Sequence, residues 1–188
     1  MQIRTNAWLQ PGVLLLLLVL GGCGATSKTP YLVQQDLGLH QQVELRHVPF
    51  FPQEEYQCGP AALATVLNGQ GVDVTPDAVS GEIYLPQRQG SLQIELTAAA
   101  RSRGLVPYPL PPNLTALLTE IDAGNPVLVL QNLGLTWFPR WHYAVAVGYD
   151  LQHHSLTLRS GKEPRHQLSF ATFDRTWQRA GRWALVIL

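Results

Sequence analysis

The sequence of 188 residues contains little charge and almost no cysteine. Charged residues account for 14% of it and the formal net charge is zero, whereas about a quarter of an average soluble domain is charged. A neutral chain offers no basic surface to a polynucleotide, so we expect no nucleic-acid partner. The 2 cysteines and 6 scattered histidines do not follow the ligand spacing of a metal site, and we expect neither a metal nor another cofactor.

The sequence also lacks an apolar run long enough to span a membrane. Its longest run extends from Val13 to Leu20, well short of the roughly 20 residues that a spanning helix needs. Arg4 precedes the run and small residues follow it, which is the order found in a secretory signal peptide. We therefore predict a signal peptide over residues 1–22.

The apolar run closes on Leu20-Gly21-Gly22-Cys23, which resembles the lipobox of bacterial lipoproteins. The resemblance implies a diacylglycerol on Cys23, cleavage before it and acylation of the new N-terminus, and two or more acyl chains anchor a protein stably. Gly24 follows in place of aspartate, which implies an outer-membrane location facing the periplasm. Residues 23–42 would then form the lipidated cysteine and its tether in the bacterial cell envelope. The alternative is an ordinary secreted protein in which Cys23 is coincidental.

Lipidation of Cys23 would leave Cys58 as the only thiol of the mature chain. An unpaired thiol in an oxidising compartment is a liability unless it is buried or used. Cys58 directly precedes Gly-Pro and an apolar segment, which predicts a helix from Gly59 to Asn68 that is buried on all sides. The unpaired N–H groups of a helix N-terminus favour an anion, so we expect the pKa of the Cys58 thiol to be lowered.

Residues 43–188 form one predicted domain, in which helices come first and antiparallel strands follow. Thr75-Pro76-Asp77 and Asn113 are typical helix starts, and short β-rich runs bounded by turns are typical strands. The predicted elements are further helices from Thr75 to Ile83, from Gly90 to Gly104 and from Asn113 to Gly124, and strands within residues 41–50, 126–133, 142–150, 155–161 and 182–188. This order predicts an α+β fold, a helical half with a central buried helix packed on an antiparallel sheet.

A base for Cys58 has to come from another part of the chain. His142 opens the predicted strand 142–150 and follows an aromatic segment, Trp137 to Trp141, so its ring is well placed to face a cleft. A lone histidine at a strand start is more often structural, but its combination with Cys58 and Gln53 favours catalysis. Gln53 is a neutral donor that could form an oxyanion hole with the backbone N–H of Cys58.

Two segments carry a family resemblance: Gln-x4-Cys-Gly-Pro-Ala-Ala-Leu-Ala, which starts at Gln53, and Trp-His-Tyr-Ala-Val-Ala-Val-Gly-Tyr-Asp, which starts at Trp141. Together they resemble the papain-like double-glycine-leader (bacteriocin-processing) cysteine peptidase family, in particular its stand-alone lipoprotein branch. The similarity extends over residues 48–161. It implies a papain-like fold, a peptide or protein substrate, Cys58 as the nucleophile, His142 as the general base and Gln53 as the oxyanion donor.

The chain departs from the family pattern at two positions. The usual glutamine lies six residues before the cysteine, whereas Gln53 lies five before it; Gln57 is the fallback. The family's third residue is an aspartate or asparagine on the strand after the histidine, and the corresponding segment here reads Thr-Leu-Arg-Ser-Gly. Asp150 cannot replace it, because eight residues of strand place it about 26 Å from His142.

Ser160 is the positional match for the missing residue, because the return strand of the predicted hairpin brings residues 159–162 back towards His142. A serine hydroxyl can accept a bond from the imidazole, but it cannot stabilise imidazolium as a carboxylate would. An unaided pair of Cys58 and His142, or an orienting group outside the pattern such as Glu163, are the other possibilities.

The leading interpretation is a membrane-anchored thiol peptidase. The chain has no G-x-x-x-x-G-K-[ST] motif, so the ATP-driven export of many family members is not expected, and neither is ATP binding. One alternative is a non-catalytic papain-like lipoprotein that binds peptides, which the missing acid or amide suggests. Another is a cell-wall amidase of the same superfamily, although those enzymes more often carry Asp-Cys-Ser-Gly around the nucleophile and this chain has Gln-Cys-Gly-Pro.

Overall fold

The computed structural model describes residues 38–53 and 57–188. The predicted signal peptide, Cys23 and the tether up to residue 37 lie outside the described residues. In the part of the chain that is described, no helix has both the length and the apolar character to cross a membrane.

The first half of the fold is mainly helical and is built around α2 (Cys58–Gly69). Nine consecutive residues of α2, from Gly59 to Leu67, are buried, as the apolar sequence predicts. Helices α3 (Pro76–Ile83) and α4 (Gln93–Arg101) pack against it, with the short 3-10 turn η2 (Pro86–Arg88) between them. The Thr75 hydroxyl accepts the N–H of Ala78 at 3.3 Å, so the predicted cap does start α3.

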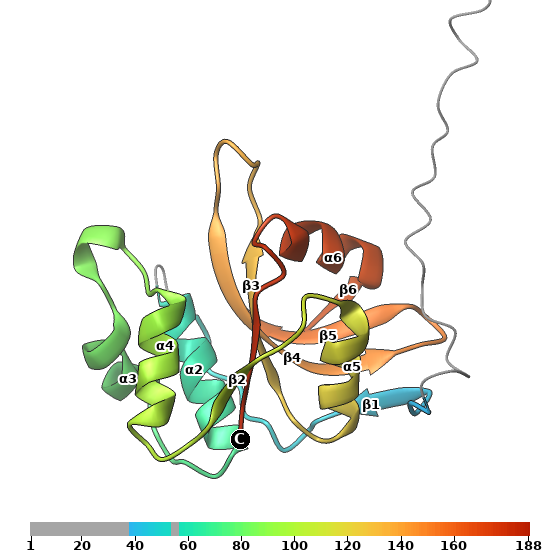
Figure 1. Ribbon diagram of the computed structural model, residues 1–188, viewed down its shortest axis with the longest axis horizontal. Helices are drawn as coiled ribbons and strands as arrows, with labels where there is room; N and C mark the ends of the chain where they lie inside the picture. Colours follow the sequence, from blue (N-terminus) through green and yellow to red (C-terminus); the bar gives the residue numbers. More distant parts are fainter. Residues whose placement is uncertain (1–37, 54–56) are drawn as a thin grey trace, which may run out of the picture. The chain divides into compact units, whose positions relative to one another are not determined.

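The second half is an antiparallel sheet of seven strands, shown in Figure 1. Six strands follow the order β2-β7-β3-β4-β5-β6, and β1 also pairs with β4. The strands are β1 (Gln42–Glu44), β2 (Pro107–Pro109), β3 (Val127–Asn132), β4 (Trp141–Asp150), β5 (Ser155–Ser160), β6 (Glu163–Ser169) and β7 (Ala184–Ile187). Strand β4 is the longest of them and pairs with three others, so residues at its start are held on a well-supported element.

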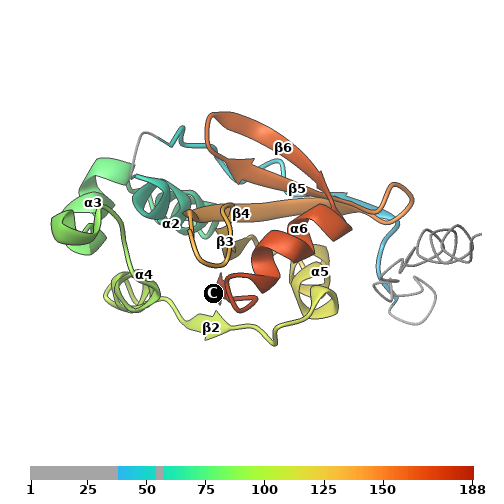
Figure 2. The ribbon, with the colours of Figure 1, turned by 90° about the horizontal axis from the view of Figure 1, so that it is seen from above.

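Three helices pack on the central strands β3 and β4. Helix α2 packs on β4, while α5 (Leu114–Asp122) and α6 (Phe170–Gln178) contact β4 and β3 respectively. In Figure 2, α2, α3 and α4 lie together at one end of the sheet, and α5 and α6 lie over its strands. Strand β3 is buried at every position, which explains its continuous apolar sequence.

The α+β architecture with a buried central helix on an antiparallel sheet agrees with the prediction from sequence. The helix predicted from Gly90 to Gly104 is shorter, Gln93–Arg101, and the strand predicted within residues 41–50 is limited to β1. Strands β2 and β6, helix α6 and the short η2 were not predicted at all. Strand β6 is mostly exposed and carries no apolar run, and β2 contains two prolines, so neither has a strand-like sequence.

Candidate active site

Cys58 is the first residue of α2 and its side chain is partly buried. Its sulfur lies close to the backbone N–H of Tyr143, the residue that follows His142, and to the N–H groups of Gly59 and Cys58 itself. Gly59 allows Ser91 to approach the start of α2 closely, because a Cβ at residue 59 would lie 2.7 Å from the Ser91 hydroxyl oxygen. The thiol is therefore enclosed between the start of α2 and the start of β4.

Burial raises the pKa of the Cys58 thiol, although the three backbone N–H groups act in the opposite direction. The expectation of a lowered pKa was wrong for this arrangement. Removing the sulfur from water disfavours the thiolate by more than the helix end and its N–H groups favour it. In the absence of a substrate, Cys58 is thus a neutral thiol.

His142 lies on β4 and contacts the residue that the hairpin geometry places opposite it. Its Nε2 is 2.8 Å from the hydroxyl oxygen of Ser160, at the end of β5. This bond occupies one ring nitrogen and leaves Nδ1 for another partner. Burial, followed by the charges of Arg140 and His166, lowers the pKa of His142 to about 4, so the ring is neutral at ordinary pH.

Gln53 is buried, and its side chain connects two elements of the site. Its Oε1 accepts the N–H of Gly161 at 2.9 Å, and its Nε2 donates to the carbonyl of Tyr143 at 3.1 Å. Its backbone N–H also donates to the carbonyl of Gly161 at 2.8 Å. The Gln53 amide contacts the carbonyl of Tyr143, and the Cys58 sulfur lies at the N–H of the same residue. Because the carbonyl and N–H of one strand residue point to the same edge, both side chains lie along one edge of β4.

The two remaining candidates from the sequence have other partners. The Oε1 of Gln57 accepts a hydrogen bond from the Ser80 hydroxyl at 3.1 Å, which ties it to α3. The carboxylate of Glu163 lies 2.8 Å from Nδ1 of His166. The structure thus brings Gln53, Cys58, His142 and Ser160 to one place, and it directs Gln57 and Glu163 elsewhere.

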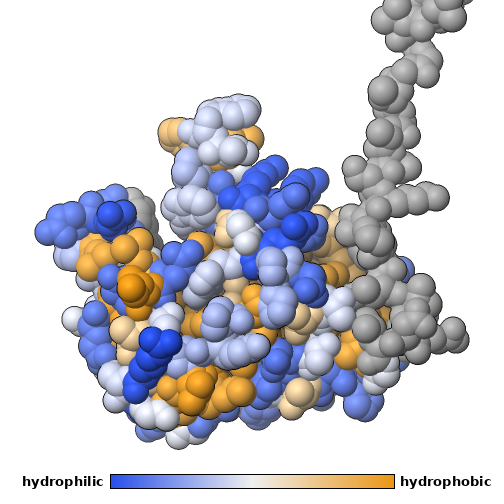
Figure 3. Space-filling model, in the orientation of Figure 1, coloured by the Kyte–Doolittle hydropathy of each residue, from blue (hydrophilic) through white to orange (hydrophobic). Residues whose placement is uncertain are grey.

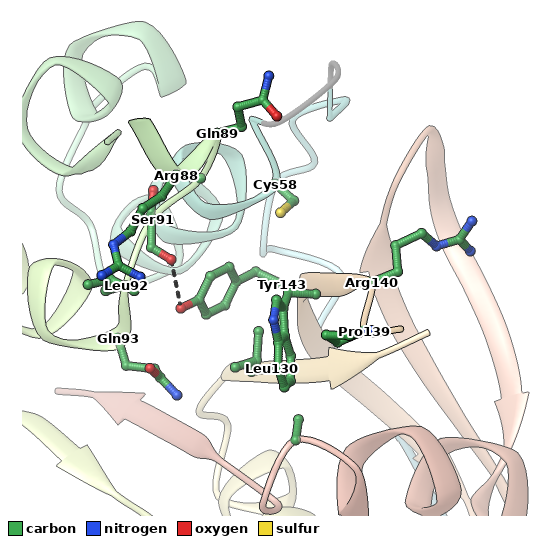
Figure 4. Close-up of a pocket in the computed structure, with 13 residues that line it drawn as sticks. Cys58, Arg88, Gln89, Ser91, Leu92, Gln93, Leu130, Pro139, Arg140 and Tyr143 are labelled. Atoms are coloured by element: carbon green, nitrogen blue, oxygen red, sulfur yellow. Dashed lines mark hydrogen bonds between the residues drawn. The ribbon is translucent and has the colours of Figure 1, made fainter. Parts of the chain in front are cut away.

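A cleft of about 500 Å³ opens beside Cys58. One wall is the segment from Arg88 to Gln93. The other comes from Leu130 of β3 and from Pro139, Arg140, Trp141 and Tyr143. Figure 4 shows Arg88 and Arg140 on opposite sides and Tyr143 between the walls, where its hydroxyl donates to the carbonyl of Ser91 at 3.3 Å. The lining includes Cys58 and Tyr143, and His142 precedes Tyr143 at the edge of this cleft.

Tyr143 and the segment from Arg88 to Gln93 were not predicted as parts of the site. Tyr143 follows His142, so its position beside the thiol follows once His142 is placed, but its bond to Ser91 joins segments that are distant in sequence. The segment from Arg88 to Gln93 has no motif of its own. Among the described residues, no three His, Cys, Asp or Glu side chains are grouped so that they could hold a metal ion.

Comparison with known proteins gives one family and several similar structures. The model of the Peptidase_C39-like family matches residues 45–185. A protein from Bacillus anthracis described as a C39-like peptidase is 18% identical, with a TM-score of 0.66 over 79% of this chain and 98% of that chain. A double glycine motif protease from an AMS/PCAT transporter, solved with its leader peptide, is 21% identical, with a TM-score of 0.57 over 79% and 98% of the two chains.

The papain-like character of the fold is visible in a more distant structure. The precursor of stem bromelain has a TM-score of 0.59 at 9% identity, over 83% of this chain and 73% of that chain. At such identities the structures show a common fold, and none of the curated proteins matches the sequence. The family model, in contrast, spans most of the chain and includes both Cys58 and His142. The chain therefore belongs to the Peptidase_C39-like family and is a cysteine peptidase with a papain-like α+β fold.

Proposed function

We propose that this chain is a thiol peptidase held at a membrane by a lipid anchor, with Cys58 as nucleophile and His142 as general base. His142 Nδ1 accepts the thiol proton as the sulfur attacks a peptide carbonyl carbon. The tetrahedral intermediate collapses to a thioester while the imidazolium gives its proton to the leaving amine. His142 then deprotonates a water molecule that hydrolyses the thioester, and the proton returns to the sulfur of Cys58.

The observation that carries this proposal is the contact between His142 Nε2 and Ser160 Oγ at 2.8 Å, next to a thiol enclosed by the neighbouring residue Tyr143. A base acts best when its ring is fixed, and Ser160 holds one nitrogen of His142. The pKa of His142, near 4, leaves the ring unprotonated and able to accept the proton of a neutral thiol.

We assign the oxyanion site to the backbone N–H of Cys58 and the amide of Gln53. The Nε2 of Gln53 carries two hydrogens, and one of them bonds to the carbonyl of Tyr143. The second has no partner among the described residues, and it can donate to an oxyanion that forms along the same edge of β4. Donors of this kind contribute about 2.7–4 kcal/mol each to the transition state.

The substrate class that fits is a peptide or an extended protein segment. The cleft is open beside Cys58 and has a wall on each side, so a chain can pass the thiol. A double glycine motif protease with the same fold was solved in complex with its leader peptide, which supports a peptide ligand for this cleft as well.

The proposal is tested with the purified mature protein, an unstructured protein such as reduced casein, and detection of new N-termini by mass spectrometry. We expect cleavage by the natural protein and none by Cys58→Ser or His142→Gln. Ser155→Ala, on the same strand as Ser160 but at its other end, is the control and should cleave normally. Cleavage that persists in Cys58→Ser would refute the assignment of the nucleophile.

A second candidate function is peptide binding without catalysis, because a serine stands where the family has a carboxylate or an amide. Natural protein that yields no new N-termini, yet binds casein fragments as tightly as Cys58→Ser does, would establish this function. Isothermal titration of both proteins separates the two outcomes.

The lipid anchor is a separate part of the proposal. Its support is the order of apolar run, small residues and Cys23 at the N-terminus. Mass spectrometry of the N-terminal peptide should show acyl chains on residue 23, and Cys23→Ala should move the protein out of the membrane fraction. An unmodified N-terminal peptide from membrane-bound protein would contradict the anchor and leave the peptidase proposal standing.

A further inference from the structure

The loop between β3 and β4, residues 133–140, carries apolar side chains that are largely exposed. Trp137 is 82% exposed, Phe138 78% and Leu135 50%. Figure 1 shows the β3–β4 hairpin extending past the end of the sheet, and Figure 3 shows its tip as a protrusion with a hydrophobic part. We call residues 133–140 the aromatic loop. Exposed aromatic residues clustered on one loop are typical of interaction sites.

The aromatic loop is held in a defined shape by its own hydrogen bonds. The backbone groups of Leu135 and Phe138 bond to each other in both directions, at 3.1 and 3.2 Å. The Oδ1 of Asn132 accepts the N–H groups of Gly134 and Arg140, each at 2.9 Å. At Gly134 a Cβ would lie 2.4 Å from the carbonyl oxygen of Phe138, so only glycine fits. Because the backbone of the loop is already ordered, binding through its apolar tip would cost little further conformational entropy.

Arginines surround the base of the aromatic loop. Arg140 closes the loop, and Arg179 donates to the carbonyl of Gly134 at 2.7 Å, which joins the end of α6 to the loop. Arg175 lies four residues before Arg179 and so on the same side of α6. In the described structure none of these three guanidinium groups has an ion-pair partner, whereas the nearby Asp174 pairs with Arg182. The loop therefore combines an apolar tip with a cationic base.

A projecting apolar tip above a cationic base complements a bilayer, whose apolar interior lies beneath anionic headgroups. Such a projection is unlike a site that binds a peptide. Peptides are bound in concave sites, and the cleft beside Cys58 is lined by Pro139, Arg140 and Trp141 but not by Trp137 or Phe138. At a bilayer, Trp and Phe enter the interface, and arginine side chains meet anionic headgroups. The predicted acylation site, Cys23, is joined to Gly38 by a segment that spans up to about 50 Å when extended, so the domain can reach the membrane.

We propose that the aromatic loop inserts Trp137 and Phe138 into the interface of a lipid bilayer, with Arg140, Arg175 and Arg179 on anionic headgroups. The loop is then a second attachment that orients an already tethered domain. Since Pro139, Arg140 and Trp141 continue from the loop into the wall of the cleft, the cleft would open next to the bilayer surface. Polypeptide segments that emerge from or lie on the membrane are the substrates that this orientation would favour. The orientation rests on the lipid anchor and not on the peptidase activity.

The test uses the mature acylated protein in vesicles whose lipids carry bromine on the acyl chains, which quench only tryptophans at membrane depth. The signal of Trp137 is obtained as the difference between the natural protein and Trp137→Phe. In vesicles of phosphatidylcholine with phosphatidylglycerol, we expect brominated chains to quench at least half of this signal, and aqueous acrylamide to quench little of it. Cys58→Ser should behave identically, which separates this result from any failure of the peptidase proposal.

A charge variant tests the cationic base. Without phosphatidylglycerol the quenching should weaken, and Arg175→Gln should lose most of the difference between the two lipid compositions. Arg101→Gln, an exposed arginine at the end of α4, is the matched control and should keep that difference. The same response in Arg175→Gln and the natural protein would refute the cationic contact.

Two results would overturn the insertion itself. Trp137 that is quenched by acrylamide and not by brominated chains lies in water. Trp137 that is protected from both quenchers only at high protein density on the vesicles is covered by a second copy of the chain.

Discussion

Cys58 and His142 are both buried, and both are neutral before a substrate binds, because burial raises the pKa of the thiol and lowers that of the imidazole. A pair of this kind differs from a preformed thiolate–imidazolium pair. The proton moves only as the carbonyl is attacked, when Gln53 and the N–H of Cys58 can meet the oxyanion. Cys58 then becomes a nucleophile only when a substrate is bound. Before that, its neutral thiol reacts slowly with small electrophiles.

The first prediction concerns the pH dependence of hydrolysis. Since His142 has a pKa near 4, its base form persists far below the usual range of histidine. We expect kcat/KM to hold from about pH 7 to about pH 5 and to fall by half near pH 4. A pH profile with a soluble peptide measures this, and an acid limb near pH 6.5, the ordinary pKa of histidine, would contradict it.

The second prediction is the response of Cys58 to iodoacetamide. Alkylation needs the thiolate, which burial disfavours, so Cys58 in the folded protein should react severalfold more slowly near pH 6 than it does in the urea-unfolded protein. Mass spectrometry of the alkylated peptide over time gives both rates. Faster reaction in the folded state would show that the thiol is already ionised there.

The third prediction concerns Ser160. Ser160→Ala removes the partner of His142 Nε2 and should lower kcat about tenfold with little change in KM, equivalent to the loss of one hydrogen bond of about 1.4 kcal/mol. Ser160→Asn restores an acceptor and should recover much of the rate. Equal kcat values for Ser160→Ala and the natural protein would mean that Ser160 does not orient the base.

Among the elements, the segment before α2, strand β4 and the turn between β5 and β6 are joined at one residue, Gln53. It bonds to Tyr143 on β4 and, through both its side chain and its backbone, to Gly161 in the turn. The same connection positions the neighbours of these two residues, His142 and Ser160. Gln53 therefore has a structural role in addition to the proposed oxyanion role.

Gln53→Ala separates the two roles of this residue. It removes the side-chain partner of the buried Tyr143 carbonyl and of the partly buried Gly161 N–H. We therefore expect the free energy of unfolding in urea to fall by about 2 kcal/mol. A residue that only binds the oxyanion would leave stability unchanged while kcat falls. Gln178→Ala, at the exposed end of α6, is the control and should change neither.

Helices α3 and α5 were predictable because their N-terminal ends carry local signals. Thr75 and Asn113 cap α3 and α5 with their side chains, as their sequences indicate. Strands β3 and β4 have the apolar runs of buried strands. Strand β2 is defined only by its pairing with β7, and helix α6 was missed even though Ser169 caps it. A pairing between segments distant in sequence leaves no local pattern to recognise.

The candidate site was predictable only where local sequence patterns indicate it. Cys58 and His142 came from the family resemblance, and the proximity of Ser160 to His142 came from the geometry of the hairpin. The bonds of Gln53 and the bond from Tyr143 to Ser91 depend on the packing of the helical half against the sheet, which the sequence does not specify locally. The pKa of Cys58 was mispredicted because the depth of burial depends on that packing too.

For the whole molecule, the buried neutral imidazole should make folding sensitive to acid. The unfolded chain binds a proton at His142 below about pH 6.5, whereas the folded chain does so only near pH 4, so stability falls as the pH is lowered through this window. Between about pH 7 and about pH 4.5 the loss from this one residue is about 2 kcal/mol. His142→Gln should therefore lose about 2 kcal/mol less than the natural protein over this range.

Urea unfolding of both proteins at the two pH values provides the measurement. Glu44 and Asp122, whose pKa values are lowered by their partners, also contribute to acid sensitivity, but equally in both proteins. Their effect cancels in the comparison. Identical losses in the two proteins would mean that the pKa of His142 is the same in the folded and unfolded states.

Strand β7, residues 184–187, lies between β2 and β3, although it follows both of them in the sequence. Its backbone supplies partners to both neighbours, and the preceding residue Trp183 packs edge-on against Tyr143 with ring centres 5.9 Å apart. A chain still emerging from a ribosome or a translocation channel lacks these residues and cannot close the sheet. The sheet beside the proposed active site, and with it the wall of the cleft, can therefore be completed only after residues 184–187 have emerged.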